Sequence, residues 1–385
     1  MKIGFDGKRA FQNITGLGNY SRSLLTALIQ HYPGNYYTLF APKQTGLFDI
    51  SSLTHTDIIT PSGNFYKKFS GLWRRKGVTK DIQQGGVDLF HGLSNELPKG
   101  ISKTGVKSVV TVHDLIFERF PETYNFDERY VHRWKIKQAC READAVIAIS
   151  KQTKEDLINF YKIPEKKIFI CYQTCSSIFQ HTVSDEEKKT VKERYGLPDK
   201  YFLFVSSITA RKNLITVAKA MALLKDKMNI PLVVIGNGNK EKIAIKKFTA
   251  DNGIANNLIL LNEKTVSKET GFTSSADFPA IYQQALALVY PSIFEGFGIP
   301  LLEAFYCGLP VISSDASSLP EVAGDAALYF SPDDIETLAG HMLQISSDNN
   351  LVNELKMKGL KRSLLFTAEQ HAKDVMNVYS SVLTK

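Results

Sequence analysis

The 385-residue sequence has few of the features that mark a membrane-spanning or a disulfide-bonded protein. Its longest apolar runs have the length of strands, far short of the roughly 20 residues that span a bilayer. No secretory pattern follows Met1, because charged residues flank the first short apolar run. Four dispersed cysteines are too few for a disulfide framework. We therefore expect a cytoplasmic protein.

Patterns that hold metal ions are also missing from the sequence. Cys171 and Cys175 form a C-x-x-x-C pair, and no second pair completes a zinc site. An Asp-x-Asp motif, which often holds a cation on a diphosphate, does not occur. The sequence therefore predicts no metal site and no metal cofactor.

The charge balance is moderately basic, with 47 Lys and Arg against 39 Asp and Glu. A net charge of +8 attracts phosphates, acidic lipids or nucleic acid without choosing among them. Residues 64–77, NFYKKFSGLWRRKG, interleave aromatic side chains with five basic ones. This segment fits an amphipathic surface helix, and it also fits a patch that contacts the inner face of an anionic membrane.

Short β-branched and aromatic runs alternate with amphipathic helical patterns along the whole chain, for example over residues 17–31 and 125–142. This alternation predicts an α/β fold with parallel sheets covered by helices on both faces. The expected strands lie at residues 2–7, 36–42, 57–61, 88–92, 108–114, 145–150, 201–207, 231–238, 257–262, 285–292, 310–315 and 327–332.

The chain is long enough for two hydrophobic cores, and its strands fall into two similar halves. We expect two Rossmann-like, doubly wound domains that face a central cleft. The first would cover residues 1–178 and the second 179–365, with the junction in the polar stretch 176–189. The C-terminal stretch 366–385 is typical of a helix, with apolar positions at Val375, Val378 and Val382.

Ligands of open α/β sheets bind beyond the carboxyl ends of the strands, so the residues found there are the candidates for a site. Gly16 and Gly18 follow the first strand and precede a helix, where they would let backbone amides approach a ligand. A third glycine of the dinucleotide motif is absent, because Ser21 occupies its place. His113 ends another strand and could bind a sugar hydroxyl or a phosphate; His91 has a weaker version of the same position.

In the second half, Arg211 and Lys212 precede a helix that starts near Asn213. Two cations beside the unpaired amides of a helix start favour a bound anion. Gly236 and Gly238 shape another strand-to-helix turn, of low specificity on its own.

The most specific stretch is FEGFGIPLLEAFYCG, residues 294–308. Gly296 and Gly298 leave room for a bulky ligand, and Pro300 suits the first turn of a helix. The amides around Phe297 and Ile299 would then point out of that helix start. Glu295 and Glu303 can each accept two hydrogen bonds, which matches the vicinal diols of a sugar and of a ribose. A nucleotide sugar contains both, with a diphosphate between them.

Residues 294–303, with GLPVISSDASSLPEVAGDAALYFSPDD downstream, resemble the retaining glycosyltransferases of GT-B architecture, specifically the mannosyltransferase-like family four. The segments SSITARKN, VHDLIFERFPETY and TGLGNYSRSLL resemble other motifs of the same family, so the resemblance spans nearly the whole chain. One departure occurs where many members read Gly-Arg-Leu and this chain has residues 206–208, Ser-Ser-Ile. The missing arginine leaves Arg211 to take its role.

The resemblance implies roles for individual residues. Glu295 would contact the donor sugar, Glu303 the ribose, Arg211 and Lys212 the diphosphate, and His113 the transferred sugar from the opposite domain. Gly16 and Gly18 would border the acceptor and phosphate region. The first domain would bind the acceptor, the second the nucleotide sugar, and the last helix would cross back onto the first domain.

The expected activity is metal-independent, retaining transfer of a hexose, by analogy mannose from GDP-mannose, to a glycan or polyprenol-linked glycan. A UDP-glucose or UDP-N-acetylglucosamine transferase of the same fold is the near alternative. A nicotinamide-dependent oxidoreductase shares the alternating pattern but lacks the full glycine motif. A nucleic-acid or membrane-binding module could use residues 64–77, but it would not need the two glutamates, and we expect no nucleic-acid partner.

Overall fold

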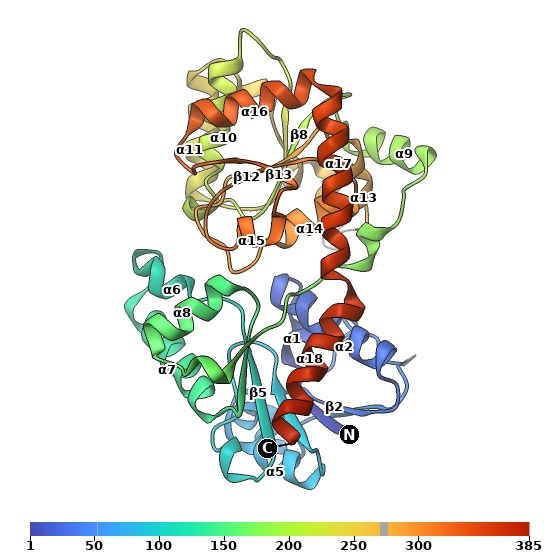
Figure 1. Cartoon of the computed structure of the whole chain (residues 1–385), viewed down its shortest axis with the longest axis vertical. Coiled ribbons are helices and arrows are strands. Elements are labelled where there is room, and N and C mark those ends of the chain that lie inside the picture. The colour runs from blue at the N-terminus through green and yellow to red at the C-terminus, as the bar shows by residue number, and fades with distance from the viewer. Residues whose placement is uncertain (52, 270–275, 385) are drawn as a thin grey trace. The chain divides into compact units, whose positions relative to one another are not determined.

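The structure is a computed structural model that describes residues 1–51, 53–269 and 276–384. The chain divides into two compact units, one made of residues 1–174 and 366–385 and the other of residues 175–365 (Figure 1). Each unit contains one parallel β-sheet with helices between its strands. The division falls four residues before the expected boundary at 178/179.

The first unit contains a seven-stranded sheet in the order β3-β2-β1-β4-β5-β6-β7. Its strands are rich in buried aliphatic and aromatic residues, as expected for parallel strands covered on both faces. The bounds are β1 Lys2–Asp6, β2 Tyr36–Phe40, β3 Thr56–Ile59, β4 Leu89–Gly92, β5 Lys107–Val112, β6 Ala145–Ala148 and β7 Ile168–Ile170.

The helices of the first unit connect these strands and include the last helix of the chain. They are α1 Lys8–Gln12, α2 Gly16–His31, α3 Asn64–Lys68, α4 Ser70–Leu72, α5 Val78–Gln84, α6 Ile116–Arg119, α7 Phe126–Glu142, α8 Lys151–Tyr161 and α18 Ala368–Leu383, with a π-helical turn at Trp73–Gly77. Helix α18 packs along α2 (Figure 1) and buries the three valines expected on its apolar face.

The second unit contains a six-stranded sheet in the order β10-β9-β8-β11-β12-β13. The chain order therefore reverses between β8 and β11, which is the switch point where doubly wound sheets bind ligands. The bounds are β8 Phe202–Val205, β9 Leu232–Ile235, β10 Leu258–Leu260, β11 Leu288–Tyr290, β12 Val311–Ser314 and β13 Ala327–Phe330.

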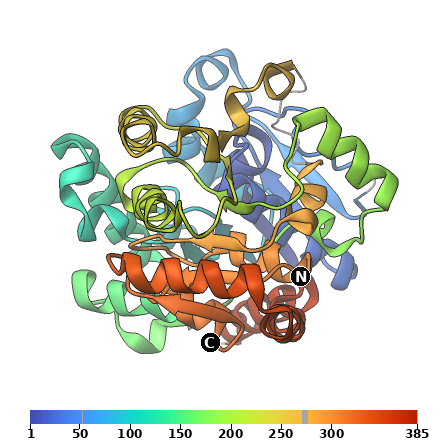
Figure 2. The same cartoon turned by 90° about the horizontal axis from the view of Figure 1, so that it is seen from above.

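Helices of the second unit cover this sheet, and α16 runs alongside β12 and β13 while also packing on α10 (Figure 2). Leu214, Val217 and Met221 from α10 meet Leu338 and Met342 from α16 in a hydrophobic core cluster of this unit. The helices are α9 Asp185–Tyr195, α10 Leu214–Leu224, α11 Lys240–Asp251, α12 Thr265–Glu269, α13 Phe278–Gln284, α14 Ile299–Tyr306, α15 Leu319–Ala323, α16 Ile335–Ser347 and α17 Asn349–Ser363.

One expectation about local structure is wrong. Residues 64–77 do not form a single amphipathic surface helix but break into α3, α4 and the π-helical turn. The turn directs Trp73 into the core and Arg74 towards Asp6 and Glu96. Among residues 1–51, 53–269 and 276–384, no helix combines the length and the hydropathy needed to cross a membrane.

Candidate functional site

A buried cluster of charged and hydroxyl groups lies at the carboxyl ends of β8 and β11 in the second unit. Lys212 and Glu295 form an ion pair, and each side chain is only 10% exposed. The Tyr290 hydroxyl donates to Glu295 Oε1 at 3.0 Å and accepts from Lys212 Nζ at 3.2 Å. The structure thus brings together residues that lie some 80 positions apart in the sequence.

Arg211 joins the cluster from the same turn as Lys212. Its Nη1 donates to the carbonyl of Phe294 and lies 3.4 Å from Glu295 Oε2. Burial opposes ionisation of Glu295, but the charges of Lys212 and Arg211 outweigh it and lower the pKa of the carboxyl group. The cluster therefore combines a carboxylate with two cations and keeps one net positive charge, which favours an anionic ligand.

Two serines hold the loop that contains Glu295. The Ser317 hydroxyl accepts from the Glu295 amide at 2.8 Å, while the Ser318 hydroxyl lies 3.0 Å from the Glu295 carbonyl and 2.8 Å from that of Phe297. Such fixed hydrogen bonds position a binding group before the ligand arrives. Neither serine was predicted from the sequence, because their partners lie about 20 residues away.

Gly298 forms the transition from this loop to α14. Its φ of 122° is one that side chains rarely allow, and a Cβ there would lie 2.8 Å from Leu319 Cδ2. Helix α14 starts at the next residue, Ile299, with Pro300 in its first turn as expected. Gly296 and Phe297 are both buried beside it. The early amides of α14 are therefore placed at the edge of the charged cluster.

Glu303 lies one turn inside α14 and accepts a hydrogen bond from the Tyr282 hydroxyl at 2.6 Å. Burial raises the pKa of Glu303 to about 7, even though the hydrogen bond from Tyr282 favours the carboxylate. Unlike Glu295, this carboxyl group forms no ion pair with a residue in the described part of the chain, so it titrates near neutral pH. Tyr282 and Tyr290, the two hydroxyl partners, were not predicted from the sequence.

Gly236 and Gly238 are required by packing within the second unit. A Cβ at residue 236 would lie 1.8 Å from the carbonyl oxygen of Ser206, and one at 238 would lie 2.2 Å from that of Ile208. The Gly236 amide donates to Asn262 Oδ1 at 2.7 Å. The glycines therefore bring the β9 turn against the β8 turn, a role that needs no ligand.

In the first unit, Gly16 and Gly18 lie inside the first turn of α2 rather than before it. The Asn13 side-chain oxygen accepts from the amides of Thr15 and Gly18, at 2.9 and 3.1 Å, and so caps the helix. A Cβ at residue 18 would meet the Asn13 carbonyl oxygen at 1.8 Å, whereas one at residue 16 would meet nothing within 4 Å. Only Gly16 leaves open space at this helix start.

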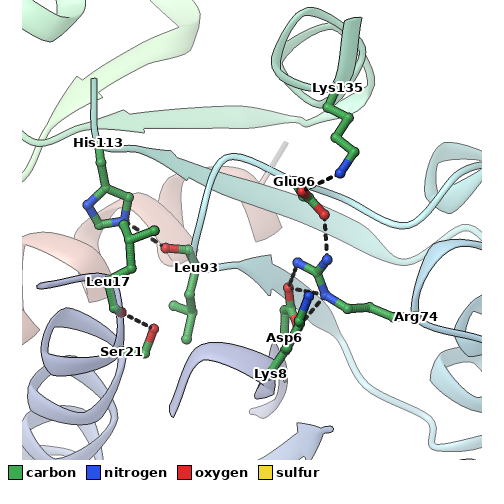
Figure 3. A network of polar contacts seen from close by, with 9 residues as sticks. All are labelled: Asp6, Lys8, Leu17, Ser21, Arg74, Leu93, Glu96, His113 and Lys135. Atoms are coloured by element: carbon green, nitrogen blue, oxygen red, sulfur yellow. Dashed lines mark hydrogen bonds and ion pairs between the residues drawn. The ribbon is translucent and has the colours of Figure 1, made fainter. Parts of the chain in front are cut away.

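His113 is buried at the end of β5, where its Nε2 lies 2.9 Å from the carbonyl oxygen of Leu93 (Figure 3). A carbonyl only accepts, so Nε2 carries the proton and Nδ1 is an acceptor. Burial lowers the pKa of His113 to about 4, which keeps the ring neutral. The ring therefore suits a sugar hydroxyl that donates to Nδ1, rather than a phosphate, which would need a donor.

His91 is less suited to a ligand. It is fully buried, with Nδ1 2.6 Å from the Tyr379 hydroxyl of α18 and Nε2 2.8 Å from Thr111 Oγ1. One ring nitrogen thus links α18 to the sheet, and the other links β4 to β5 within it. No group of three or more potential metal ligands is found in the described part of the chain.

Two family models match the chain along most of its length. The model named Glycosyltransferase Family 4 matches residues 14–173, and the model named Glycosyl transferases group 1 matches residues 185–362. The first range lies in the first unit and the second in the second unit.

Curated relatives and solved structures agree with these models. O-antigen chain mannosyltransferase B of Escherichia coli is 28% identical over 76% of this chain and 74% of its own length. Serotype-specific mannosyltransferase WbdA of Escherichia coli is 30% identical over 73% of this chain, which spans about a third (34%) of that protein. The crystal structure of Anabaena HepE in complex with UDP and glucose superposes with a TM-score of 0.73 at 15% identity, covering 99% of this chain and 100% of that one.

Two Rossmann-like units, each matched by a glycosyltransferase model, define the class of GT-B glycosyltransferases. Within that class, the chain belongs to family four, as its sequence motifs indicate.

Proposed function

We propose that this protein is a retaining, metal-independent hexosyltransferase that moves mannose from GDP-mannose to a glycan or polyprenol-linked glycan in cell-surface polysaccharide synthesis. The observation that carries the proposal is the buried Lys212–Glu295–Arg211 cluster beside the start of α14. It pairs a carboxylate, which suits sugar hydroxyls, with cations and amides, which suit a diphosphate. The names of the two Escherichia coli relatives support mannose as the sugar.

The two glutamates would hold opposite ends of the donor. Glu295 is ionised and held rigidly, so it can accept hydrogen bonds from two hydroxyls of the transferred sugar. Glu303 would accept from the hydroxyls of the ribose once it is ionised. Because each hydroxyl donates to a carboxylate, both contacts are charge-assisted and stronger than neutral ones.

Departure of the diphosphate is the step at which charge develops. In the proposed reaction, the acceptor oxygen bonds to the anomeric carbon while the bond from that carbon to the phosphate oxygen breaks. The electron pair goes to the phosphate, and the proton of the acceptor hydroxyl follows on the same face of the sugar. Arg211, Lys212 and the first amides of α14 would stabilise the new negative charge without a metal.

The remaining assignments are part of the same proposal. His113 would accept a hydrogen bond from a hydroxyl of the transferred sugar at Nδ1, Gly16 would leave space beside the acceptor, and Gly236 would border the nucleotide. The matched control for His113 is His91, because both of its ring nitrogens are already hydrogen-bonded within the first unit. We expect His113→Ala to lower turnover while the protein stays folded, whereas His91→Ala should lower its melting temperature.

Peripheral contact with the inner face of a membrane would bring the enzyme to a polyprenol-linked acceptor. Phe65, Phe69 and Leu72 are 40–59% exposed, and Lys67 and Lys68 lie among them. These side chains can enter the interface while the lysines meet acidic headgroups. Cosedimentation of the protein with phosphatidylglycerol vesicles should decrease with added salt and in the double variant Phe65→Ser/Phe69→Ser. Equal binding to neutral vesicles would reject the contact between the lysines and acidic headgroups.

The experiment that tests the proposed function is thermal unfolding with GDP-mannose, UDP-glucose, UDP-N-acetylglucosamine, a dTDP-sugar and NADH. A ligand at 100 times its dissociation constant stabilises the folded state by about 2.7 kcal/mol. We expect GDP-mannose to give the largest shift. A larger shift with a UDP-sugar would show that the donor is that UDP-sugar rather than GDP-mannose. A shift with NADH alone would contradict the proposed glycosyltransferase activity.

A further inference from the structure

Hydrogen bonds hold His113 at its backbone and at one edge of its ring. Its Nε2 donates to the Leu93 carbonyl at 2.9 Å (Figure 3). Its backbone amide donates to Asn95 Oδ1 at 2.9 Å, and its carbonyl accepts from Thr153 Oγ1 at 3.2 Å. These bonds fix the peptide groups on both sides of the residue. The direction of Nδ1, the nitrogen proposed to meet the sugar, also depends on what packs against the ring.

Tyr20 of α2 provides a packing contact to this ring. The two ring centroids are 4.5 Å apart and the ring planes meet at 89°, which is the edge-to-face arrangement that aromatic rings favour. Both side chains are buried, with 3% of Tyr20 and 6% of His113 exposed. In a close-packed interior, the imidazole cannot turn without displacing the tyrosine ring. Tyr20 therefore limits the directions in which Nδ1 can accept a hydrogen bond.

The Tyr20 ring is itself held by the strand that leads to His113. Its hydroxyl lies 3.0 Å from Thr111 Oγ1 in β5. His113 follows two positions after Thr111, and side chains two positions apart along a strand point to the same face of the sheet. One tyrosine can therefore bond to Thr111 with its hydroxyl and pack against His113 with its ring.

Helix α18 adds a second imidazole to this packing. His371 is 2% exposed, and its ring centroid lies 5.5 Å from that of Tyr20. Neither of its ring nitrogens has a hydrogen-bond partner in the part of the chain that the structure describes. Burial, and then the neighbouring His113, lower the pKa of His371 to about 3, so the ring stays neutral. Without hydrogen bonds, the contribution of this ring is its packing against Tyr20.

The same helix reaches Thr111 through hydrogen bonds. Tyr379 lies two turns after His371 on α18, and its hydroxyl is 2.6 Å from His91 Nδ1. His91 Nε2 is in turn 2.8 Å from Thr111 Oγ1, the atom that also meets the Tyr20 hydroxyl. Helix α18 therefore supports Tyr20 both at its ring and, through this chain, at its hydroxyl.

We infer that Tyr20, supported by His371 of α18, is a positioning residue for the contact between His113 and the transferred sugar. The inference rests on the proposed function, which gives His113 that contact, and it adds the residues through which the contact is oriented. It also gives the C-terminal helix a part in sugar binding without any contact to the substrate. A tyrosine with only a structural role would stabilise the first unit and leave ligand binding unchanged.

The test is calorimetric titration of the full-length protein with GDP and GDP-mannose, and with UDP and UDP-glucose in parallel. The proposed nucleotide contacts lie in the second unit, so Tyr20→Leu should bind GDP as tightly as wild type. It should bind GDP-mannose about three- to tenfold more weakly, as expected when one hydrogen bond to a sugar hydroxyl is lost. If only the UDP pair binds wild type, the same comparison is made between UDP and UDP-glucose.

A double-variant cycle shows whether Tyr20 acts through His113. His113→Ala should weaken binding of GDP-mannose but not of GDP. Tyr20→Leu/His113→Ala should lose no more affinity than His113→Ala alone, because the contact that Tyr20 orients is already missing. A further loss in the double variant would show that Tyr20 does not act through His113, and would overturn the inference.

Two further variants separate the ring contact from stability. Tyr20→Phe keeps the ring and should keep the wild-type ratio of the GDP-mannose and GDP affinities. Tyr37→Leu removes another buried tyrosine of the first unit, whose hydroxyl donates to the carbonyls of Leu28 and Tyr32. It should lower the melting temperature and leave the ratio unchanged. If Tyr20→Leu does not fold, His371→Ala replaces it, with a smaller loss of GDP-mannose affinity expected.

The remaining outcomes distinguish the inference from the proposed function. Equal weakening of GDP and GDP-mannose in Tyr20→Leu, or wild-type affinity for both, would show that Tyr20 is only structural. If His113→Ala binds GDP-mannose as wild type does, the sugar contact of His113 is rejected and the inference with it. If no nucleotide sugar binds wild type, the proposed function itself is rejected.

Discussion

Lys212 and Glu295 form a buried ion pair in the second unit, although 83 positions separate them in the sequence. Each side chain is the main charged partner of the other, so neither can be removed alone without leaving a buried charge. Breaking a buried pair costs about 3–5 kcal/mol, whereas replacing both members by apolar groups is often nearly neutral.

Replacing Lys212 should therefore affect stability and binding in separable ways. We expect Lys212→Met to destabilise the second unit by about 2–4 kcal/mol, somewhat less than an isolated pair because Arg211 remains near Glu295. Lys212→Met/Glu295→Leu should recover most of that stability but not the binding of a nucleotide sugar. Urea unfolding followed by circular dichroism measures the first effect and calorimetry the second. If the double variant binds the donor as wild type does, Lys212 and Glu295 are not part of the donor site.

Replacing Glu295 and replacing Glu303 should change different kinetic constants. Glu295→Ala acts beside the reacting sugar and should chiefly lower kcat, while Glu303→Ala loses the ribose contact and should chiefly raise KM for the donor. Removal of a charge-assisted hydrogen bond predicts an effect of roughly ten- to a hundredfold in each case. Steady-state kinetics with varied donor checks the split. Exposed Glu336 provides the control, and Glu336→Ala should behave as wild type.

Donor binding should depend on pH through Glu303. Its pKa of about 7 means that the carboxylate, the form that accepts two hydroxyl hydrogen bonds, increases from pH 6 to pH 8. Affinity for GDP-mannose should rise about tenfold over that range, and Glu303→Gln should flatten the profile. The hydrogen bond from Tyr282 lowers the pKa of Glu303, and Tyr282→Phe removes it. The midpoint of the pH dependence of GDP-mannose binding should therefore move to higher pH in this variant.

Without donor, the same group should have the opposite effect on stability. A carboxyl pKa raised above its value in the unfolded chain stabilises the folded state at acid pH, and this contribution is lost as pH rises from about 4.5 to about 7. Unliganded wild type should therefore lose stability across this window relative to Glu303→Gln. A constant difference between the two proteins would show that Glu303 does not titrate there.

Arg74 should be important for the stability of the first unit. Arg74→Met leaves Asp6 and Glu96 without their shared cation, and we expect a loss of about 3 kcal/mol. The two tryptophans of the chain, Trp73 and Trp134, both lie in this unit, so their fluorescence during urea unfolding reports on it alone.

The stability lost in Arg74→Met should also vary with pH. The lowered pKa of Glu96 contributes stability that is present above about 4.5 and is lost as pH falls towards 2. The difference between wild type and Arg74→Met should therefore shrink over that window. Arg75→Met, which loses only the contact with the Trp134 ring, is the control and should cost less than about 1 kcal/mol.

The strands of both sheets could be predicted from the sequence because parallel strands that are buried on both faces consist of short, nearly continuous apolar runs. All twelve expected strands occur, and among the strands of the described residues the one not predicted is β7, a three-residue edge strand that is partly exposed. The prediction for residues 64–77 was wrong because a helical pattern reflects only neighbouring residues. Arg74 turns inward to pair with Asp6 and Glu96, which lie 68 and 22 positions away in the sequence.

The site could be predicted only as far as individual residues. The motifs indicated Glu295, Glu303, Arg211 and Lys212, but not that Lys212 pairs with Glu295 before any ligand binds. Tyr282 and Tyr290 look like ordinary core residues of α13 and β11, and their hydroxyl partners are set by tertiary packing. The different ionisation of the two glutamates also follows from packing, since only Glu295 has adjacent cations.

The most direct test of the account is calorimetric titration of GDP-mannose into the protein in excess EDTA, before and after adding Mg²⁺. We expect binding of equal strength with and without the metal, because Arg211, Lys212 and the first amides of α14 take the electrostatic role that a cation has elsewhere. Binding should be lost in Lys212→Met/Glu295→Leu and retained in Glu336→Ala. Binding that disappears in EDTA and returns with Mg²⁺, or that persists in the double variant, would contradict the account.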